Sequence, residues 1–328
     1  MSNYSISQIT TKLSNLFNPF ANSTLGALDA IKHVGVDKDK DIVVLIITTY
    51  TNNPEEVKYL RKAIAKLIKI DLEFSGVKIE FEQAKVLSCQ NAKFILIESG
   101  KGGVGKSQIA INLAYQLALL GKKVGLIDGD IYTPSTNIML MIPNQTLAVN
   151  DYGKIIPHKI KDFEMVSVEF FNQPDEAVLW SKDIVNNMFS NFLYQVAWSK
   201  DLEYMIVDMP SLTTEFMVNV KSLLPNSEVL LVTSPSFTSA HSVIKAGNGV
   251  KQLGQSIIGV IENMNGFPVS KDEDEYLNTN GGKVVSNALD IELICSIPFK
   301  PARTGYLYEL DEENGQIFKD LATLISIR

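Results

Sequence analysis

Apolar and polar positions alternate in short blocks along the chain, and these blocks fall into two stretches. In the first, apolar runs at residues 42–47 and 77–81 predict strands, and a helical pattern at residues 54–70 separates them. A further helix is expected at residues 25–31. Residues 21–86 are therefore predicted to form a small α/β domain.

The segment before this domain, residues 1–20, is polar and rich in Ser and Asn. Ile6, Ile9 and Leu13 nevertheless recur at helical spacing. The pattern predicts a leader or a short docking helix without chemistry of its own.

The second stretch covers residues 93–328. An apolar run at residues 94–97 leads through a glycine-rich turn into a helical pattern with an apolar stripe from Ile109, and a strand is expected at residues 123–127. Strand, helix and strand at this spacing predict a right-handed βαβ crossover. The expected fold class is α/β, with a doubly wound, mostly parallel sheet whose ligand crevice lies at the carboxyl ends of the strands.

The glycine-rich turn has the composition and setting of a phosphate-binding loop. Glycines adopt backbone angles closed to other residues, and they let main-chain N–H groups approach phosphate oxygens. The helix that follows adds its positive dipole end. Lys106 is expected to reach the β- and γ-phosphates, and Ser107 to bind Mg²⁺. The predicted nucleotide-binding residues of this segment are Gly100, Lys101, Gly102, Gly103, Val104, Gly105, Lys106, Ser107 and Gln108.

Three aspartates follow predicted strands of the same sheet. Asp128 and Asp130 come directly after the strand at residues 123–127, and Asp208 ends another apolar run. Because carboxyl ends of parallel strands share one edge, these acids are expected to face the phosphates. The alternative is a turn or helix-capping role, which is common for aspartate.

Composition limits the possible partners and compartments. The 328 residues carry a net charge of −7, which argues against nonspecific binding to nucleic acid. There is no long uninterrupted apolar run, so no membrane association is expected. Only Cys89 and Cys295 are present, so a disulfide framework is not expected and a reducing cytoplasm is the predicted location.

Lys101 adds a class resemblance. Gly-Lys-Gly-Gly-Val-Gly-Lys-Ser at residues 100–107 resembles the deviant Walker A class, which includes MinD, ParA and nitrogenase iron protein. In that class the extra lysine reaches the nucleotide of a partner subunit, so the resemblance implies a homodimer with ATP between the subunits and a catalytic role for Lys101 beside Lys106. From its position alone, Lys101 also fits a solvated loop charge.

Further runs are similar to the Mrp (ApbC) family of ATPases, which carry iron–sulfur clusters to client proteins. The small N-terminal domain also resembles a reduced version of the domain that often precedes this ATPase, and it is interpreted as an interaction or regulatory module. The runs that carry the resemblance are residues 126–135, 177–180, 196–198, 204–210, 259–267 and 296–301.

The resemblance implies a set of roles. Asp130 matches the switch I aspartate, which orients the attacking water, and Asp208 matches the carboxylate that holds Mg²⁺ through water, with Asp128 beside it. Asn263 is implied to bind the adenine edge, and Pro298 and Pro301 belong to the loop that packs on the base and ribose. The implied activity is hydrolysis of ATP with Mg²⁺.

The first departure from the family concerns its Cys-Pro-x-Cys pair, which holds an iron–sulfur cluster across the dimer. This chain has Pro-Val-Ser-Lys at residues 268–271. Such clusters need four thiolates, and a dimer would offer only Cys89 and Cys295 twice, far apart in sequence. Cys295 lies in an apolar run and is interpreted as a small buried hydrophobe.

The second departure concerns the loops near the γ-phosphate. Both glycines of the family's switch II are replaced, by Leu212 and Thr214, which do not adopt positive φ cheaply. The family's Trp-Arg-Gly-Pro is Trp-Ser-Lys-Asp at residues 180–183. Slow or impaired hydrolysis is the prediction.

Three functions remain in view. The leading hypothesis is a homodimeric, weakly active ATPase related to the cluster carriers, either with unusual cluster ligands or with the switch kept and the metal lost. The second is a spatial regulator like MinD or ParA, which requires a basic surface or an amphipathic anchor. The third is a nucleotide-binding scaffold that has lost cluster binding and most hydrolysis.

Overall fold

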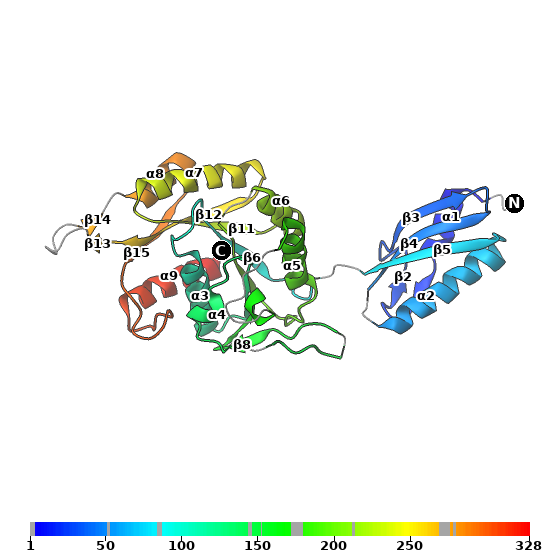
Figure 1. Cartoon of the computed structure of the whole chain (residues 1–328), viewed down its shortest axis with the longest axis horizontal. Helices are drawn as coiled ribbons and strands as arrows, with labels where there is room; N and C mark the ends of the chain where they lie inside the picture. Colours follow the sequence, from blue (N-terminus) through cyan, green and yellow to red (C-terminus); the bar gives the residue numbers. More distant parts are fainter. Residues whose placement is uncertain are drawn as a thin grey trace. The chain divides into compact units, whose positions relative to one another are not determined.

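The chain forms two compact units in the computed structural model, residues 1–86 with 151–153 and residues 87–150 with 154–328. Figure 1 colours the first unit blue to cyan and the second cyan to red. The structure describes residues 4–50, 53–83, 87–143, 146–151, 153–171, 180–211, 214–268, 276–277 and 280–328.

The first unit is a three-stranded sheet with helices. Strand β4 (Ile42–Thr49) lies in the middle, antiparallel to β3 (Ile31–Asp37) and parallel to β5 (Gly76–Gln83). Helices α1 (Ile6–Ser14) and α2 (Pro54–Lys66) contribute buried apolar residues to the same core as β4. Shorter elements of this unit are β1 (Phe17–Asn18), β2 (Ser23–Thr24) and a π-helical segment (Leu67–Asp71).

Helix α2 begins where local chemistry favours it. The side chain of Asn53 accepts a hydrogen bond from the backbone N–H of Glu55 at 2.9 Å, and Pro54 occupies the first turn. The cap satisfies a donor that the helix itself leaves without a partner. This signal is readable from the sequence.

The helix predicted at residues 25–31 is wrong. Residues 25–29 form turns, in which Asp29 has a φ of 50°, and Ile31 already begins β3. The backbone N–H of Ala30 donates to Leu25 at 2.9 Å, and Ile31 pairs with Ile47 on β4. Pairing with β4 is a tertiary contact, and it overrides the local helical pattern.

The second unit contains an eight-stranded sheet in the order β15-β12-β11-β6-β10-β7-β9-β8. Neighbouring strands are parallel except for β8, which is antiparallel to β9. The strands are β6 (Lys93–Glu98), β7 (Val124–Asp128), β8 (His158–Ile160), β9 (Phe163–Val166), β10 (Tyr204–Asp208), β11 (Glu228–Thr233), β12 (Ser256–Asn265) and β15 (Leu293–Pro298).

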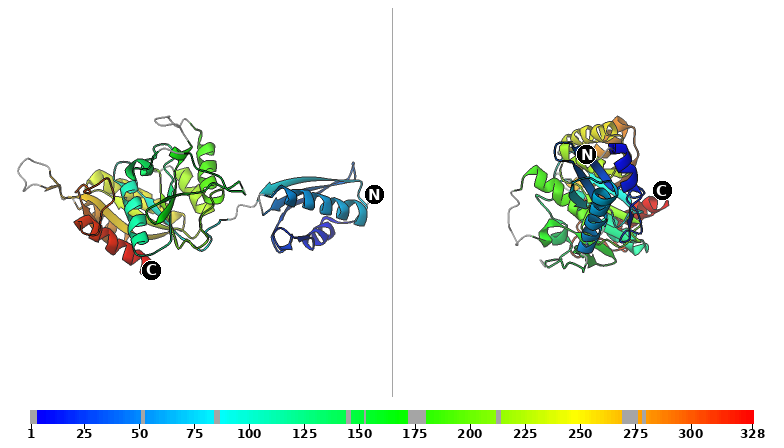
Figure 2. Two further views of the ribbon diagram at one scale, coloured as in Figure 1. Left: turned by 90° about the horizontal axis from the view of Figure 1, so that it is seen from below. Right: turned by 90° about the vertical axis from the view of Figure 1, so that its right-hand side faces the viewer.

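Helices cover both faces of this sheet, as Figures 1 and 2 show. One apolar core joins Ile95 and Ile97 of β6 to α3 and α9, and the other joins Phe94 and Leu96 to α5, α6, α7 and α8. Alternate residues of one strand thus serve opposite faces. The helices are α3 (Lys106–Leu119), α4 (Thr136–Met139), α5 (Lys182–Tyr194), α6 (Thr214–Leu223), α7 (Phe237–Gln252), α8 (Gly281–Leu289) and α9 (Glu313–Ile327).

The predicted fold class, a doubly wound and mostly parallel α/β sheet, is confirmed. A short 3₁₀ turn (Val168–Phe170) and a two-stranded ribbon of β13 (Phe267–Pro268) and β14 (Tyr276–Leu277) complete the unit. Among the described residues, no helix combines the length and apolarity needed to span a bilayer.

Candidate functional site

The glycine-rich loop joins the central strand β6 to helix α3. Gly103 and Gly105 have φ values of 80° and 87°, in the left-handed region that favours glycine. A Cβ on Gly105 would lie 2.2 Å from Nδ2 of Asn263, which donates to the carbonyl of Val104 at 3.0 Å. A Cβ on Gly100 would lie 2.0 Å from the carbonyl oxygen of Ser242 on α7. At Gly100 the backbone of α7 excludes a Cβ, whereas at Gly103 and Gly105 it is the positive φ that favours glycine.

The two lysines of the loop have different surroundings. Lys106 is buried, and its Nζ donates to Oγ of Ser211 at 3.2 Å. Lys101 is exposed, and its backbone carbonyl accepts a hydrogen bond from Oγ of Ser99 at 2.7 Å. Lys106 is therefore buried within this unit, whereas Lys101 lies on its surface.

Asp208 lies at the carboxyl edge of the sheet beside this loop. It ends β10 and pairs directly with Asp128 at the end of β7 and with Ile97 of β6. Neither carboxylate oxygen of Asp208 has a hydrogen-bond partner within the described residues, although the side chain is buried. Burial first, and then the charge of Asp128, raise the pKa of Asp208 well above its usual value, while Ser107 and Lys106 oppose the shift.

Asp128 has a full set of donors. Its Oδ2 accepts from Oγ1 of Thr136 at 2.7 Å, from Oγ of Ser167 at 3.3 Å and from the backbone N–H groups of Ser135 and Thr136 at 3.3 Å each. Burial, the largest cause, raises the pKa of Asp128 to about 6, and these hydroxyls oppose it. The carboxyl therefore holds the loop that follows β7, and its metal role stays a prediction.

Asp130 lies in that loop. Its Oδ1 accepts from the backbone N–H of Thr133 at 3.3 Å, and burial raises its pKa. Together with Tyr132, Pro210 and Ser211 it lines a cavity of about 300 Å³. Asp130 thus borders the same space as Ser211, the partner of Lys106.

A second cavity, of about 500 Å³, is lined in part by Gly103 and Gly105 of the loop. Its size is sufficient for a nucleoside. The predicted residues Gly103, Gly105, Gln108, Asn263, Pro298 and Pro301 line it together with Met139, Met264, Phe299, Lys300, Ala302, Gly305, Tyr306 and Tyr308.

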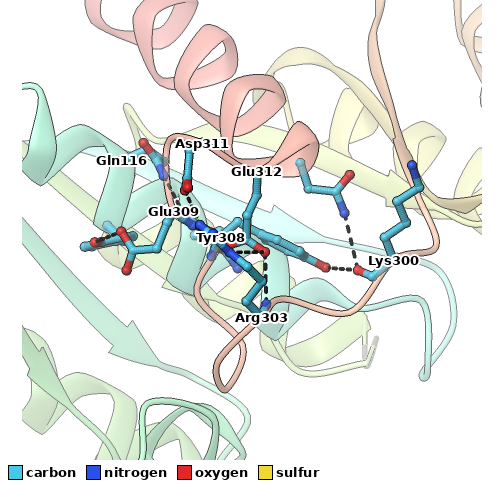
Figure 3. Close-up of polar contacts among 10 residues, drawn as sticks. Gln116, Lys300, Arg303, Tyr308, Glu309, Asp311 and Glu312 are labelled. Atoms are coloured by element: carbon cyan, nitrogen blue, oxygen red, sulfur yellow. Dashed lines mark hydrogen bonds and ion pairs between the residues drawn. The ribbon is translucent and has the colours of Figure 1, made fainter.

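Tyr308, which lines this cavity, is bonded to helix α3. Figure 3 shows Tyr308 with its neighbours Gln116 and Lys300. The Tyr308 hydroxyl accepts from Nε2 of Gln108 at 3.0 Å and donates to the carbonyl of Lys300 at 2.5 Å. Its backbone N–H donates to Oδ1 of Asn112, and its carbonyl accepts from Nε2 of Gln116, both at 2.9 Å. The wall is therefore tied to the helix that starts in the phosphate-binding loop.

The end of the same wall is held by charged groups. The backbone N–H groups of Arg303 and Glu309 donate to the carboxylate of Glu312 at 2.9 and 2.7 Å. The Arg303 guanidinium also contacts Asp311 (Figure 3). Tyr115 on α3 donates to Glu309 at 3.0 Å. These bonds order a segment that has no strand or helix of its own.

The family with the description ParA, NUBPL iron-transfer P-loop NTPase, matches residues 90–319. The chain belongs to this family. It is 29% identical to the iron-sulfur cluster carrier protein of Bacillus subtilis, over 98% of this chain and 97% of the relative. It is 32% identical to the protein of the same name in Synechocystis, over 89% and 86% of the two chains. The family resemblance read from the sequence is confirmed.

Solved structures agree with a NUBPL-type P-loop NTPase fold. A nucleotide-binding protein of Archaeoglobus fulgidus, in complex with ADP, is 25% identical with a TM-score of 0.53, over 72% of this chain and 89% of that chain. MinD of Pyrococcus horikoshii, complexed with Mg-ADP, is 21% identical with a TM-score of 0.53, over 71% and 96%. The second likeness concerns the fold alone.

The cysteines of this NUBPL-type NTPase are poor thiolate donors. Burial raises the pKa of Cys89 to about 11 and that of Cys295, on the edge strand β15, to about 12. In the described part of the chain, no three His, Cys, Asp or Glu side chains are grouped to hold a metal ion. The replaced cysteine pair falls at residues 268–271, of which 269–271 lie outside the described residues.

The altered switch II is described only in part. Leu212 lies outside the described residues, and Thr214 begins α6. The altered segment at residues 180–183 contributes Lys182 on α5, which forms an ion pair with Glu215 at 2.7 Å beside the 300 Å³ cavity. The predicted effect on hydrolysis stays a prediction.

Sequence reasoning missed three side chains of this NUBPL-type site. Ser211 and Tyr308 act as partners of predicted residues, and Glu98 ends β6 directly before the loop. Glu98 is 1% exposed, and burial, the largest cause, raises its pKa to about 8. The sequence did contain a signal for Glu98: an acid at the end of an otherwise apolar strand, beside a phosphate-binding loop.

Proposed function

We propose that the protein is a homodimeric ATPase of low turnover whose nucleotide state controls dimer closure and, through it, the binding of a client protein. The observation that carries the proposal is one continuous edge of the sheet. It holds the phosphate-binding loop, the buried side chains of Lys106 and Asp208, and a nucleoside-sized cavity next to Asn263. The ADP complex of the Archaeoglobus fulgidus protein supports nucleotide as the ligand class.

The loop and its lysine bind the triphosphate in this proposal. The positive φ of Gly103 and Gly105 lets backbone N–H groups approach phosphate oxygens, and the amino end of α3 adds a partial positive charge. Lys106 exchanges its bond to Ser211 for the β- and γ-phosphates. The amide of Asn263 and the loop with Pro298 and Pro301 enclose the adenine.

The donor set fits a magnesium ion. Ser107 would supply a hydroxyl, and Asp208 a buried carboxyl whose oxygens have no partner among the described residues. Oxygen donors of this kind suit Mg²⁺. When bound, the ion would neutralise charge on the β- and γ-phosphates.

Hydrolysis and dimer closure use the remaining residues. Asp130 borders the cavity beside Ser211 and accepts a hydrogen bond from the attacking water in this proposal. Lys101 is exposed on the surface of its own subunit. In this proposal its side chain reaches the nucleotide of the partner copy, as the deviant Walker A resemblance implies. Leu212 in switch II keeps the rate low, because it resists the positive φ that glycine allows.

An iron–sulfur cluster does not fit the cysteines that this chain offers. The related carriers are named for such a cargo. Here the high pKa values of Cys89 and Cys295 disfavour thiolates, and the position of the family's cysteine pair has Val269 and Ser270. We therefore favour a version in which the nucleotide switch of the family acts on a client protein, and in which the cysteines of this chain hold no cluster.

The test is calorimetry with Mg-ATP on the full chain and on Lys106→Ala. Heat of binding in the parent and its loss in Lys106→Ala are expected. Turnover should fall to background in Asp130→Ala, and light scattering should show ATP-dependent dimers. Absence of any binding heat in the parent would refute the proposal.

Reconstitution with iron and sulfide tests the cluster part separately. The expected result is no visible absorbance above that of a Cys89→Ala, Cys295→Ala double variant. Colour that requires either cysteine would overturn this part and restore the carrier version.

A further inference from the structure

Helix α2 of the first unit has two contrasting faces. Leu60 and Ile64 are buried in the core of that unit, and Ile68 continues the same face in the π-helical segment that follows. The opposite side is exposed to solvent and carries basic side chains. We call it the basic stripe, and it consists of Lys58, Arg61, Lys62, Lys66 and Lys69.

Charge of a single sign sets this surface apart from the rest of the chain. Residues 57–70 contain five basic residues and no acid, in a chain whose net charge is −7. Each of the other α-helices in the described structure contains at most two lysines or arginines. A helix face that meets only solvent typically mixes the two signs, so the composition of the stripe indicates a further role.

Contacts within the chain leave much of this charge without a counter-ion. Lys58 forms an ion pair with Glu55 at 3.4 Å. The guanidinium of Arg61 lies 5.1 Å from the centre of the Phe81 ring, which is a cation–π contact. In the described part of the chain, no ion pair involves the three remaining lysines of the stripe.

The spacing of these lysines is unfavourable for the helix by itself. Lys62 lies four residues from both Lys58 and Lys66, and like charges at this spacing repel each other along a helix. The helix dipole favours a cation in the last turn, as at Lys66, but it does not favour Lys58 near the other end. Negative groups that approach the stripe offset the repulsion, so the pattern favours binding of an acidic partner.

We propose that the basic stripe is the docking surface for an acidic segment of another protein. Tyr59 and Ile70 follow its first and last lysines in the chain, and they are 41% and 66% exposed. They offer the apolar contacts that a protein partner uses and a phosphate backbone does not. From Lys58 to Lys69 the stripe is about 16 Å long, which corresponds to about three turns of an acidic helix.

Two other kinds of anionic partner fit less well. A helix that lies in a membrane surface inserts its apolar face, but Leu60, Ile64 and Ile68 are 0% exposed in the core of this unit. A nucleic acid is a longer polyanion, and the net charge of −7 opposes its approach. A short acidic segment of a protein needs to meet only the stripe.

The first experiment measures binding of an acidic peptide to the full chain. The probe is a fluorescein-labelled peptide of repeated Glu-Glu-Leu-Glu blocks, about a dozen residues long to match the stripe. Fluorescence anisotropy should show saturable binding that weakens as salt is added. The triple variant Lys62→Gln, Lys66→Gln, Lys69→Gln should lower the affinity at least about tenfold.

A matched control removes the same charge elsewhere on the first unit. Lys12→Gln, Lys38→Gln, Lys40→Gln changes three exposed lysines outside the stripe and should keep the parent's affinity for the peptide within about twofold. Circular dichroism checks the fold of both triple variants. Because repulsion is relieved, the stripe variant should melt at the parent's temperature or above it. A clear drop would contradict the repulsion on which the proposal rests.

Other outcomes would overturn the proposal. Equal losses of peptide affinity in the two triple variants would show that net charge, and not the stripe, attracts the probe. Stripe-dependent cosedimentation with vesicles of phosphatidylcholine and phosphatidylserine would assign the surface to a membrane. Tighter binding of a DNA duplex of the same length than of the peptide would assign it to nucleic acid.

The stripe belongs to the first unit, whereas the phosphate-binding loop belongs to the second. Calorimetry should therefore give the same Mg-ATP affinity for the stripe variant as for the parent. Stripe-dependent peptide binding by a chain that binds no nucleotide would refute the proposed function and support the docking surface.

Discussion

Asp208 and Asp128 end adjacent parallel strands as a direct cross-strand pair, yet their carboxyls have opposite surroundings. Asp128 accepts from the hydroxyls of Thr136 and Ser167, whereas neither oxygen of Asp208 has a partner among the described residues. Strand register places the two acids side by side, and among the described residues the loop after β7 donates hydrogen bonds to Asp128 and not to Asp208. On this difference rests our proposal that Asp208 serves a bound ligand, whereas Asp128 accepts the hydrogen bonds of the loop.

Replacement of Lys101 should separate binding from dimerisation. Lys101 is exposed in this chain, so Lys101→Ala is expected to bind Mg-ATP within about threefold of the parent, because the Lys106 contacts remain. ATP-dependent dimers, measured by light scattering, should be lost. Lys159→Ala, at an exposed lysine of the edge strand β8, is the control and should dimerise normally.

Gly105→Ala should abolish nucleotide binding. The new Cβ would lie 2.2 Å from Asn263, and the residue has a φ of 87°. Gly121, just beyond the other end of α3, has a φ of 80°, and a Cβ added there would meet open space. Gly121→Ala should therefore cost about 1 kcal/mol of stability and leave binding intact. Equal binding by both variants in calorimetry would contradict the steric argument.

Tyr308→Phe should weaken ATP and ADP equally. The lost hydroxyl joins Gln108 to the carbonyl of Lys300 and so holds one wall of the 500 Å³ cavity. A loss of about 1 kcal/mol corresponds to a several-fold lower affinity. Tyr115→Phe removes a hydroxyl that bonds Glu309, away from the residues lining the cavity, and is expected to have a smaller effect.

The pH dependence of stability should report the buried Glu98. Burial raises its pKa from 4.5 to about 8, so the native state binds more protons than the unfolded state between these values. Stability of the metal-free protein should therefore fall as pH rises from about 4.5 to about 8, by an amount on the order of a few kcal/mol. Lys106 attracts the charged form of Glu98 and limits the loss.

Urea unfolding with a chelator, at several pH values across this range, measures the effect. Glu98→Gln should give a flatter profile than the parent. Identical slopes for the parent and Glu98→Gln would show that Glu98 does not titrate in this range.

Removal of the thiols should not affect nucleotide binding. Cys89 is buried in the core that includes Phe94, and Cys295 lies on the edge strand β15. Cys295→Ala deletes one sulfur far in sequence from the loop and is expected to leave the Mg-ATP affinity unchanged. A large loss, seen by calorimetry with the fold intact, would assign this thiol a role that its high pKa opposes.

The sequence by itself determined the phosphate-binding loop, the doubly wound sheet and the family, because these depend on local glycine chemistry and on short-range apolar periodicity. Gly105 and Asp208 are examples. Gly105 was predicted from its residue type and its place between a predicted strand and a predicted helix. Asp208 was predicted from its residue type and its place at the end of a predicted strand. The segment at residues 25–31 shows the limit, since pairing with β4 replaced its helical pattern.

Only the tertiary structure decided which polar groups meet across the sheet. Asp128 and Asp208 are separated by 80 positions in the chain, and parallel strand register makes them a direct cross-strand pair. Gln108 and Tyr308 meet in the same way, 200 positions apart. Partner choice at this distance depends on strand order and helix packing, which local residue patterns do not encode.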